Sequence, residues 1–404
     1  MGPVKVNRAM TVLLGAVSLA AVSAPRALPA TSAADTRLIV VAVSGHDTGA
    51  GTLADPLATI QAAVDRSGPG DTIAVRGGTY PLTDNITITT SGTAGSPITL
   101  TNYSGERVVI DGERLPAGHT PVGGSIPRAE RGAIHQEAAH WRIRGLEIIH
   151  GPYGIYCAGC DDNEFTGLTT RDNYESGFQL QGASSRNLIA NLDSYGNRDP
   201  RKNGESADGL AIKEGQGEGN RVRGARLWNN ADDGFDAWEF TSPIALENTV
   251  AYGNGFNRWG FPDFTGDGNG FKLGGGGDVD PPADHSLRNA IAFGNAAHGV
   301  TDNGNPGALA ISRTTTYRNG GSGFRTDRSR ATLTANLSLL DTEPVRLGGS
   351  TSRGNSWDLG GVWNEGSVLS TDPAKITGPR AADGSLPSSP FLVPRDGSAL
   401  GARF

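Results

Sequence analysis

Four aspartates in two short segments are the residues of this chain best suited to hold a metal ion. Asp208 stands in "SADGLAIK", while Asp232, Asp233 and Asp236 stand in "NNADDGFDAWEF". Carboxylates brought together repel and raise one another's pKa unless a cation neutralises them, and calcium takes six to eight oxygen ligands. A single aspartate in such a loop usually caps a turn. Four of them without an accompanying histidine or cysteine favour a calcium site over a zinc site.

One lysine that follows the acidic segments could act as a base. Lys272 stands in "DGNGFKLGGGG", where the glycines leave room for a ligand. A lysine on a strand is normally a solvated charge, but a nearby dication would disfavour its ammonium form and prepare it to accept a proton. Lys213 is the alternative base and is also a candidate substrate contact.

A metal site, a lysine base and no isolated pair of acids predict β-elimination on an acidic sugar polymer. Calcium would bind the uronate carboxylate and acidify the C5 proton, lysine would remove that proton, and the C4–O bond would break. The net charge of −7 also calls for a bridging cation, because an acidic protein repels an acidic polymer. Two alternatives stay open. The aspartates could imitate the two carboxylates of a glycoside hydrolase, or the chain could be a non-catalytic carbohydrate-binding protein.

An internal repeat predicts how the chain positions these residues. A glycine followed by an apolar residue recurs with spacings of 32, 25, 36, 29 and 24 residues. The pairs are Gly177-Phe178, Gly209-Leu210, Gly234-Phe235, Gly270-Phe271, Gly299-Val300 and Gly323-Phe324. A period near 24 with insertions, in a chain with 59 glycines and many short β-rich runs, predicts an all-β fold: a right-handed parallel β-helix with three sheets.

Alignment of the coils on this pair gathers the candidate residues on one outer face. Strand side chains alternate, so the residues after the pairs should point outward; they are Gln179, Ala211, Asp236, Lys272, Thr301 and Arg325. The residues before the glycines are Ser176, Asp208, Asp233, Asn269, His298 and Ser322. Neighbouring parallel strands lie about 4.8 Å apart, so residues in one column are direct neighbours. Arg325, two coils beyond Lys272, would either bind a sugar carboxylate or remain an ordinary surface arginine.

A second repeated element predicts a corner of the coil. It ends in asparagine and recurs as Tyr195-Gly196-Asn197, Leu227-Trp228-Asn229, Tyr252-Gly253-Asn254, Phe293-Gly294-Asn295 and Tyr317-Arg318-Asn319. Asparagines stacked at one turn could form a ladder of side chains that bond the backbone groups freed by that turn.

The segment before the repeat predicts a cap. Residues 38–43 and 72–75 resemble strands, and 56–64 has helical spacing that ends at Gly68-Pro69-Gly70. A short helix here would cover the open end of the stacked sheets. We therefore expect one catalytic domain over 35–404, with an N-terminal cap at about 38–80, coils at about 85–365 and a C-terminal tail at about 366–404.

The first 34 residues predict a signal peptide and therefore secretion into the extracellular space. Lys5 and Arg8 form a basic start, an apolar run covers 10–22, and small residues at 32–34 offer a cleavage site. The apolar run is too short to span a bilayer.

The composition argues against nucleic acid and membranes as partners, which leaves the acidic polysaccharide. No basic tract suggests nucleic acid, no later segment is apolar enough to span a membrane, and we expect a monomer. In an oxidising compartment Cys157 and Cys160 would either close a small disulfide loop or remain as two buried thiols.

Three motifs together resemble polysaccharide lyase family nine. They are "SADGLAIK" (206–213), "NADDGFDAW" (230–238) and "GNGFKLGG" (268–275), and the segments 51–80 and 383–400 are also similar to that family. The resemblance covers nearly all of the chain after the predicted signal peptide. It implies a β-helix, usually a pectate lyase, with calcium on four aspartates and a lysine base. By position these are Asp208, Asp232, Asp233 and Asp236, with Lys272 as the base.

Two insertions would form the walls of a substrate groove. They cover 196–206 and 257–270, and their candidate sugar contacts are Arg198, Arg201, Lys202, Arg258, Trp259 and Asn269. Loops of this composition are often merely solvated. The substrate could also be another acidic polysaccharide, since the family resembles several specificities.

Overall fold

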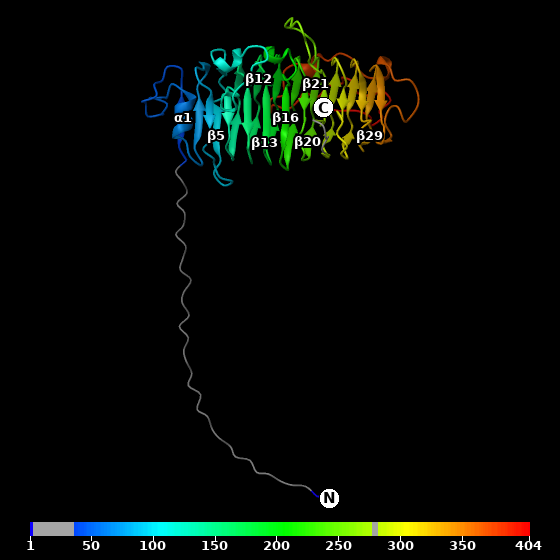
Figure 1. Cartoon of the computed structure of the whole chain (residues 1–404), viewed down its shortest axis with the longest axis horizontal. Helices are drawn as coiled ribbons and strands as arrows, with labels where there is room; N and C mark the ends of the chain where they lie inside the picture. The colour runs from blue at the N-terminus through cyan, green and yellow to red at the C-terminus, as the bar shows by residue number, and fades with distance from the viewer. Residues whose placement is uncertain (3–35, 277–281) are drawn as a thin grey trace. The chain divides into compact units, whose positions relative to one another are not determined.

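Successive coils each contribute one strand to each of three parallel sheets, and they stack from α1 to β29 as Figure 1 shows; β1 and β32 add one further strand at each end of the first sheet. The computed structural model describes residues 1–2, 36–276 and 282–404. The predicted signal peptide therefore lies outside the described residues, except for its first two. The predicted right-handed parallel β-helix is confirmed.

Within the described residues the three sheets have 12, 10 and 10 strands. The first sheet contains β1 (Leu38–Val41), β2 (Thr72–Val75), β5 (Ile98–Asn102), β8 (Trp141–Arg144), β11 (Glu164–Thr166), β14 (Leu188–Ala190), β17 (Asn220–Arg223), β20 (Ile244–Glu247), β23 (Ser286–Arg288), β26 (Ala310–Ser312), β29 (Thr332–Thr334) and β32 (Thr351–Arg353). The second contains β3 (Gly78–Pro81), β6 (Val108–Asp111), β9 (Glu147–Ile149), β12 (Thr169–Arg171), β15 (Asp193–Tyr195), β18 (Arg226–Trp228), β21 (Val250–Tyr252), β24 (Ile291–Phe293), β27 (Thr315–Tyr317) and β30 (Leu337–Leu339). The third contains β4 (Ile86–Ile88), β7 (Ile134–Gln136), β10 (Ile155–Ala158), β13 (Phe178–Ala183), β16 (Leu210–Gln216), β19 (Phe235–Asp236), β22 (Phe271–Lys272), β25 (Val300–Thr301), β28 (Ser322–Arg325) and β31 (Glu343–Arg346).

The inside of the coil is filled by side chains from the repeated glycine–apolar pairs. Phe178, Leu210, Phe235, Phe271, Val300 and Phe324 lie in register on successive strands of the third sheet and are fully buried. The preceding glycine is required by space, because a Cβ at Gly234 would lie 2.6 Å from the carbonyl oxygen of Gly270. The repeat seen in the sequence is thus a packing requirement of the third sheet.

A buried asparagine ladder holds the corner after the second sheet. Each side-chain oxygen accepts from the backbone N–H and the Nδ2 of the preceding member, through Asn173, Asn197, Asn230, Asn254, Asn295, Asn319 and finally Asp341. The ladder prediction is confirmed, but its member in the Trp228 coil is not Asn229. Trp228, rather than Leu227, pairs with Tyr195, so the next position but one is Asn230.

The N-terminal helix begins later than its sequence pattern predicts. The helix α1 (Ile60–Arg66) packs on β1, β2 and β4, with Thr59 Oγ1 accepting from the N–H of Ala62. Residues 56–59 stay outside the helix, because Leu57 forms a bridge with Val41 and Asp47 accepts from the N–H groups of 58 and 59. The strands of the predicted cap already pair into the first and second sheets.

The C-terminal tail covers the second sheet from outside. Its apolar residues Val368, Ile376, Phe391 and Leu400 pack with buried residues of β21, β24, β27 and β30. The tail includes α2 (Ala374–Thr377) and the 3-10 turn η4 (Glu365–Ser367). The remaining short turns are η1 (Pro116–His119), η2 (Arg128–Glu130) and η3 (Pro200–Lys202). The candidate site residues lie on the outer face of the third sheet.

Two further observations answer expectations from the sequence. Cys157 and Cys160 are joined in a disulfide, which decides between the two alternatives left open. Among the described residues no helix is both long and apolar enough to cross a bilayer.

Candidate active site

The strand register of the third sheet places the predicted residues in one outward column. Gln179, Ala211, Asp236, Lys272, Thr301 and Arg325 are paired from strand to strand in that order. Asp236 and Lys272 are therefore neighbours on adjacent coils. The register prediction, made from the period-2 alternation of strand side chains, is confirmed.

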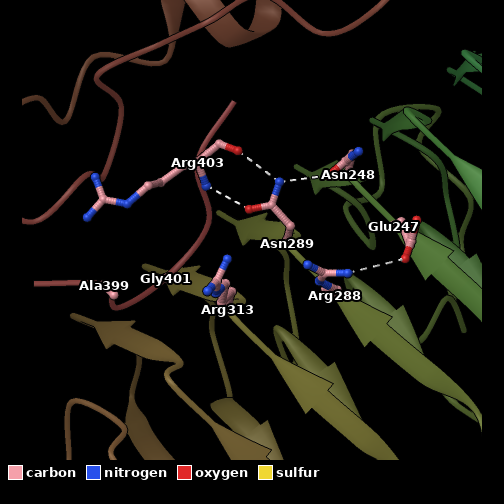
Figure 2. A pocket seen from close by; sticks show the side chains of 8 residues that line it. All are labelled: Glu247, Asn248, Arg288, Asn289, Arg313, Ala399, Gly401 and Arg403. Atoms are coloured by element: carbon pink, nitrogen blue, oxygen red, sulfur yellow. Dashed lines mark hydrogen bonds and ion pairs between the residues drawn. The ribbon is translucent and has the colours of Figure 1, made fainter.

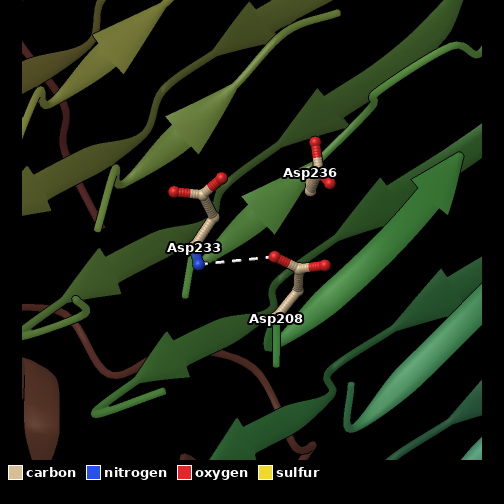
Figure 3. A group of neighbouring side chains, drawn as sticks. All are labelled: Asp208, Asp233 and Asp236. Carbon is tan, nitrogen blue, oxygen red and sulfur yellow. Dashed lines mark hydrogen bonds between the residues drawn. The ribbon is translucent and has the colours of Figure 1, made fainter. Parts of the chain in front are cut away.

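The predicted aspartates converge in a buried cluster, of which Figure 3 shows Asp208, Asp233 and Asp236. Carboxylate oxygens of Asp208, Asp233 and Asp236 lie within 4.8 Å of one another, and so do those of Asp232, Asp233 and Asp267. We call these five residues the acid cluster. The four predicted members are at most 2% exposed.

Backbone and amide donors fix the orientation of the carboxylates. Asp208 Oδ1 accepts from the N–H of Asp233 at 3.3 Å. Asp233 Oδ1 accepts from both the N–H and the Nδ2 of Asn269, at 2.6 and 2.9 Å. Asp232 Oδ1 accepts from the N–H of Asp267 at 2.6 Å. The turns before β16, β19 and β22 thus hold the cluster in one arrangement.

Two lysines supply the positive charge. Lys213 Nζ lies 2.8 Å from Asp208 Oδ2 and 3.2 Å from Asp236 Oδ2. Lys272 Nζ lies 3.0 Å from Asp267 Oδ2, 3.3 Å from Asp233 Oδ2 and 3.8 Å from Asp236 Oδ1. Burial acts to lower the pKa of both lysines, but the carboxylates around them raise it well above its ordinary value.

Three of the four buried aspartates remain short of positive charge. Burial raises the pKa of Asp208 to about 6 and that of Asp233 to about 7, although the lysines act in the opposite direction. Burial and repulsion from Asp233 raise the pKa of Asp232 well above its ordinary value. Burial also acts to raise the pKa of Asp236, but the lysines on both sides hold it below its ordinary value. A bound cation would relieve this imbalance.

The donor set suits a hard cation. Every group of the cluster offers oxygen, and no described histidine or cysteine contributes to it. Asp233 Oδ2 is buried and accepts no hydrogen bond from the described residues, although Lys272 lies nearby. A buried carboxylate oxygen that accepts no hydrogen bond is available to coordinate a metal ion.

Comparison with known proteins identifies the family. The family described as "Pel9A-like, right handed beta helix region" matches residues 39–336. The chain belongs to the Pel9A-like family. Pectate lyase PEL9 of Emericella nidulans is 51% identical, over 93% of this chain and 95% of that protein. Pectate lyase L of Dickeya chrysanthemi is 33% identical, over 87% and 82%.

A solved structure agrees with these relatives. The crystal structure of pectate lyase Pel9A superimposes with a TM-score of 0.78 at 30% identity, covering 90% of each chain. The chain is therefore a polysaccharide lyase, and the resemblance to family nine is confirmed.

Not every candidate residue of this Pel9A-like lyase reaches the acid cluster. Asn269 does, but its amide is engaged with Asp233. Arg325 lies in the column and contacts Asp327 and His298. In the described residues, Arg258 bonds Asn229 and its neighbour Trp259 stacks on Phe261, without a contact to the cluster. Their roles as substrate contacts stay predictions.

The 196–206 insertion of the lyase holds its three cations differently. Arg198 stacks on Tyr174, with its guanidinium 4.2 Å from the ring centre. Arg201 forms a buried ion pair with Glu175, and Lys202 Nζ donates to Ser206 Oγ at 3.0 Å. Arg201 and Lys202 line a hollow beside the acid cluster, whereas Arg198 does not.

Sequence reasoning missed Asp267. It lies in the second insertion, and its side chain is 55% exposed although it contacts the buried Lys272. The available signal was its place five residues before the lysine, in the same glycine-rich segment. A contact that depends on the path of a long loop does not follow from strand periodicity.

A larger hollow of the lyase lies elsewhere, beside the ends of β20, β23 and β26 (Figure 2). It has a volume of about 350 Å³ and is lined by Arg288, Arg313 and Arg403. Asn289 fixes the tail here, because its side chain bonds both the N–H and the C=O of Arg403. The guanidinium groups of this hollow keep their protons, and Glu247, the carboxylate of the lining, is paired with Arg288 at 3.9 Å.

Proposed function

We propose that this lyase cleaves pectate by calcium-assisted β-elimination, with Lys272 as the base. The observation that carries the proposal is the position of Lys272 Nζ, 3.3 Å from Asp233 and 3.8 Å from Asp236 at the edge of the acid cluster. The pectate lyases of Emericella nidulans and Dickeya chrysanthemi support the substrate class.

Asp208, Asp232, Asp233 and Asp236 are the residues that would hold calcium. When bound, calcium supplies a Lewis acid that draws charge from the substrate carboxylate and so acidifies the neighbouring C–H group. The aspartates orient their oxygens through the bonds from the 233, 267 and 269 N–H groups. The burial of all four keeps bulk water from competing for these oxygens.

Lys272 would remove the C5 proton of the uronate at its Nζ. The carboxylates around Lys272 raise its pKa. Their charge must therefore be neutralised before Lys272 can lose its proton and act as a base. The electron pair released from C5 then forms the C4–C5 double bond as the C4–O bond breaks. The departing oxygen leaves with the electron pair of that bond and takes a proton from water. Lys213, tied to Asp208 and Asp236, would position those two carboxylates.

The test uses the purified chain and polygalacturonate with added calcium. We expect absorbance from the unsaturated uronate product to rise, and a chelator to abolish the rise. Lys272→Ala should remove the signal, whereas Lys375→Ala, which changes an exposed lysine of α2, should not. Reducing ends released without unsaturated product would contradict elimination. Product formed from another polyuronate alone would contradict pectate as the substrate.

We propose also that the lyase is secreted after removal of residues 1–34. The basic start, the apolar run and the small residues before Asp35 support this. Expression in a secreting host should deliver protein to the medium with an N-terminus at or near Asp35, as N-terminal sequencing would report. Retention of the full chain inside the cell would contradict export.

A further inference from the structure

A hollow of about 180 Å³ lies beside the acid cluster, towards the N-terminal coils. Its lining includes Gln179 of β13 and Lys213 of β16, and Lys213 also contacts the cluster. Gln179 pairs with Ala211, on the coil of Asp208, and Ala211 pairs with Asp236. The hollow therefore begins one coil, roughly 5 Å, before Asp208 and two coils before Asp236. A polymer running across the third sheet from the cluster would pass over it.

The wall of this hollow is rigidly built. Asp199 accepts from the N–H groups of Lys202 and Ser206, which fixes the turn η3. Arg201 donates to the C=O of Gly124, and its own C=O accepts from the N–H of Gly123. The 196–206 insertion is thereby pinned to the segment that precedes β7. The hollow does not depend on a ligand to give it shape.

One carboxylate in the wall is already neutralised. Glu175 is 3% exposed, pairs with Arg201 and accepts from Tyr153 Oη at 2.6 Å. The negative charge of Glu175 is therefore used within the protein. Glu214, the other carboxylate of the lining, is exposed and accepts from Gln181 Nε2.

Two cations that line the hollow have no acidic partner in the described parts of the chain. Arg131 donates to Tyr156 Oη at 3.2 Å and to the C=O of Ile126 at 3.3 Å. Among the described residues, the ammonium of Lys202 donates only to Ser206 Oγ. A guanidinium and an ammonium on one concave surface of an acidic protein favour an anionic ligand.

Two buried polar atoms of the lining also lack partners among the described residues. They are Gln179 Oε1, on a side chain that is 2% exposed, and Arg201 Nε. The first needs a donor such as a hydroxyl, and the second needs an acceptor. A ligand with hydroxyls and a carboxylate would satisfy both the unpaired cations and these atoms.

We propose that this hollow is a subsite for an uncleaved uronate unit of the substrate. Arg131 and Lys202 bind its carboxylate, and Gln179 accepts from a hydroxyl. The inference rests on the proposed function, because it assumes that an acidic polymer crosses the acid cluster. It adds a specificity for acidic over neutral sugars on the N-terminal side of the acid cluster.

The kinetic test compares Lys202→Ala and Arg131→Gln with wild type on oligogalacturonates of increasing length. We expect KM to rise at least tenfold while kcat stays within about threefold, because the contact is remote from the reacting bond. The increase should appear only for oligomers long enough to reach the hollow. Arg221→Gln is the matched control, since it removes an exposed arginine from β17 in the first sheet.

A binding test separates this subsite from the chemistry. Calorimetry in the Lys272→Ala background should show about tenfold weaker binding of long oligogalacturonates when Lys202→Ala is added. Oligomers whose carboxyls are reduced to alcohols should bind both forms equally. Equal affinity of both forms for the acidic oligomers, or equal KM at every length, would overturn the subsite while wild-type turnover upholds the proposed function. Absence of unsaturated product from wild type would instead overturn the proposed function. The calorimetric comparison would then still test whether the hollow binds acidic oligomers.

Discussion

Lys272 and Asp236 occupy the same position on adjacent coils, with the lysine Nζ 3.8 Å from Oδ1 of the carboxylate. On the other side of Asp236, Lys213 Nζ lies 3.2 Å from Oδ2. One carboxylate thus separates two lysines that differ in their remaining partners. Lys213 contacts only buried aspartates, whereas Lys272 also contacts the half-exposed Asp267. Lys272 is therefore the lysine on the side of the second insertion, whereas Lys213 lines the hollow towards the N-terminal coils.

This difference predicts that the two lysines fail differently when removed. Lys272→Ala should lower kcat by roughly 10²–10⁴-fold, the usual contribution of a general base. Lys272→Arg should be similarly inactive, because a guanidinium keeps its proton. Initial rates with polygalacturonate and saturating calcium would measure both. Calorimetry should show that oligogalacturonate binding survives the change.

Lys213→Ala should chiefly affect stability without metal. The change leaves Asp208 and Asp236 with one cation fewer, so we expect a lower melting temperature in chelator and substantial recovery in calcium. Thermal unfolding with and without calcium measures the difference. A Lys213→Ala variant with normal stability and no activity, beside an active Lys272→Ala variant, would exchange the two assignments.

Asp267 predicts a smaller catalytic effect. Its carboxylate lies 3.0 Å from Lys272 Nζ and its N–H donates to Asp232. Asp267→Asn keeps the backbone bond but weakens the contact that positions the lysine, so kcat should fall about tenfold, as for one lost bond to a charged group. Asp263→Asn, an exposed change in the same loop, is the control. Equal rates for the two variants would remove Asp267 from the machinery.

The candidate site could be predicted from sequence wherever strand geometry alone decides it. Alternation placed Asp236 and Lys272 on one outward column, and stacking placed Asp208 beside Asp233. Neither inference needs to know the path of a loop. Asp267, by contrast, reaches Lys272 only because the loop after β21 folds back over the coil, which no local pattern encodes.

The fold could also be predicted from a local pattern. The prediction was wrong in detail where two neighbouring residues could fill the same position. The glycine–apolar pairs fix the period, because each coil needs a glycine, such as Gly234, where its backbone lies close to the backbone of the next coil. At the corner, two adjacent asparagines could each join the ladder. The backbone decides: Asn229 takes a φ of 55°, and the buried ladder position falls to Asn230.

The same pair of asparagines predicts a contrast in stability. Asn230→Ala removes an amide that bonds Asn197 and Asn254 and leaves buried donors unpaired, which should lower the unfolding free energy by about 3–5 kcal/mol. Asn229→Gly should cost less than about 1 kcal/mol, because glycine accepts the positive φ. Denaturant unfolding of both variants measures the contrast. Similar losses for both would contradict the assignment of the ladder.

A buried histidine away from the acid cluster predicts how stability depends on pH. His285 is 0% exposed, and its Nδ1 accepts from the N–H of Ile244. Burial lowers the pKa of His285 to about 4, with Asp284 acting weakly against it. His285 takes up a proton near pH 6.5 in the unfolded chain but only near pH 4 in the folded chain. This contribution to stability is therefore complete above pH 6.5 and is lost as the pH falls towards 4.

His285→Asn isolates this effect, because its side-chain oxygen can still accept from Ile244 but does not titrate. Between pH 7 and 4.5 the wild type should lose roughly 2–3 kcal/mol more unfolding free energy than the variant. Denaturant unfolding in chelator at several pH values measures both curves, and the contributions of all other groups cancel in their difference. If the two curves ran parallel, His285 would not be the group that charges on unfolding.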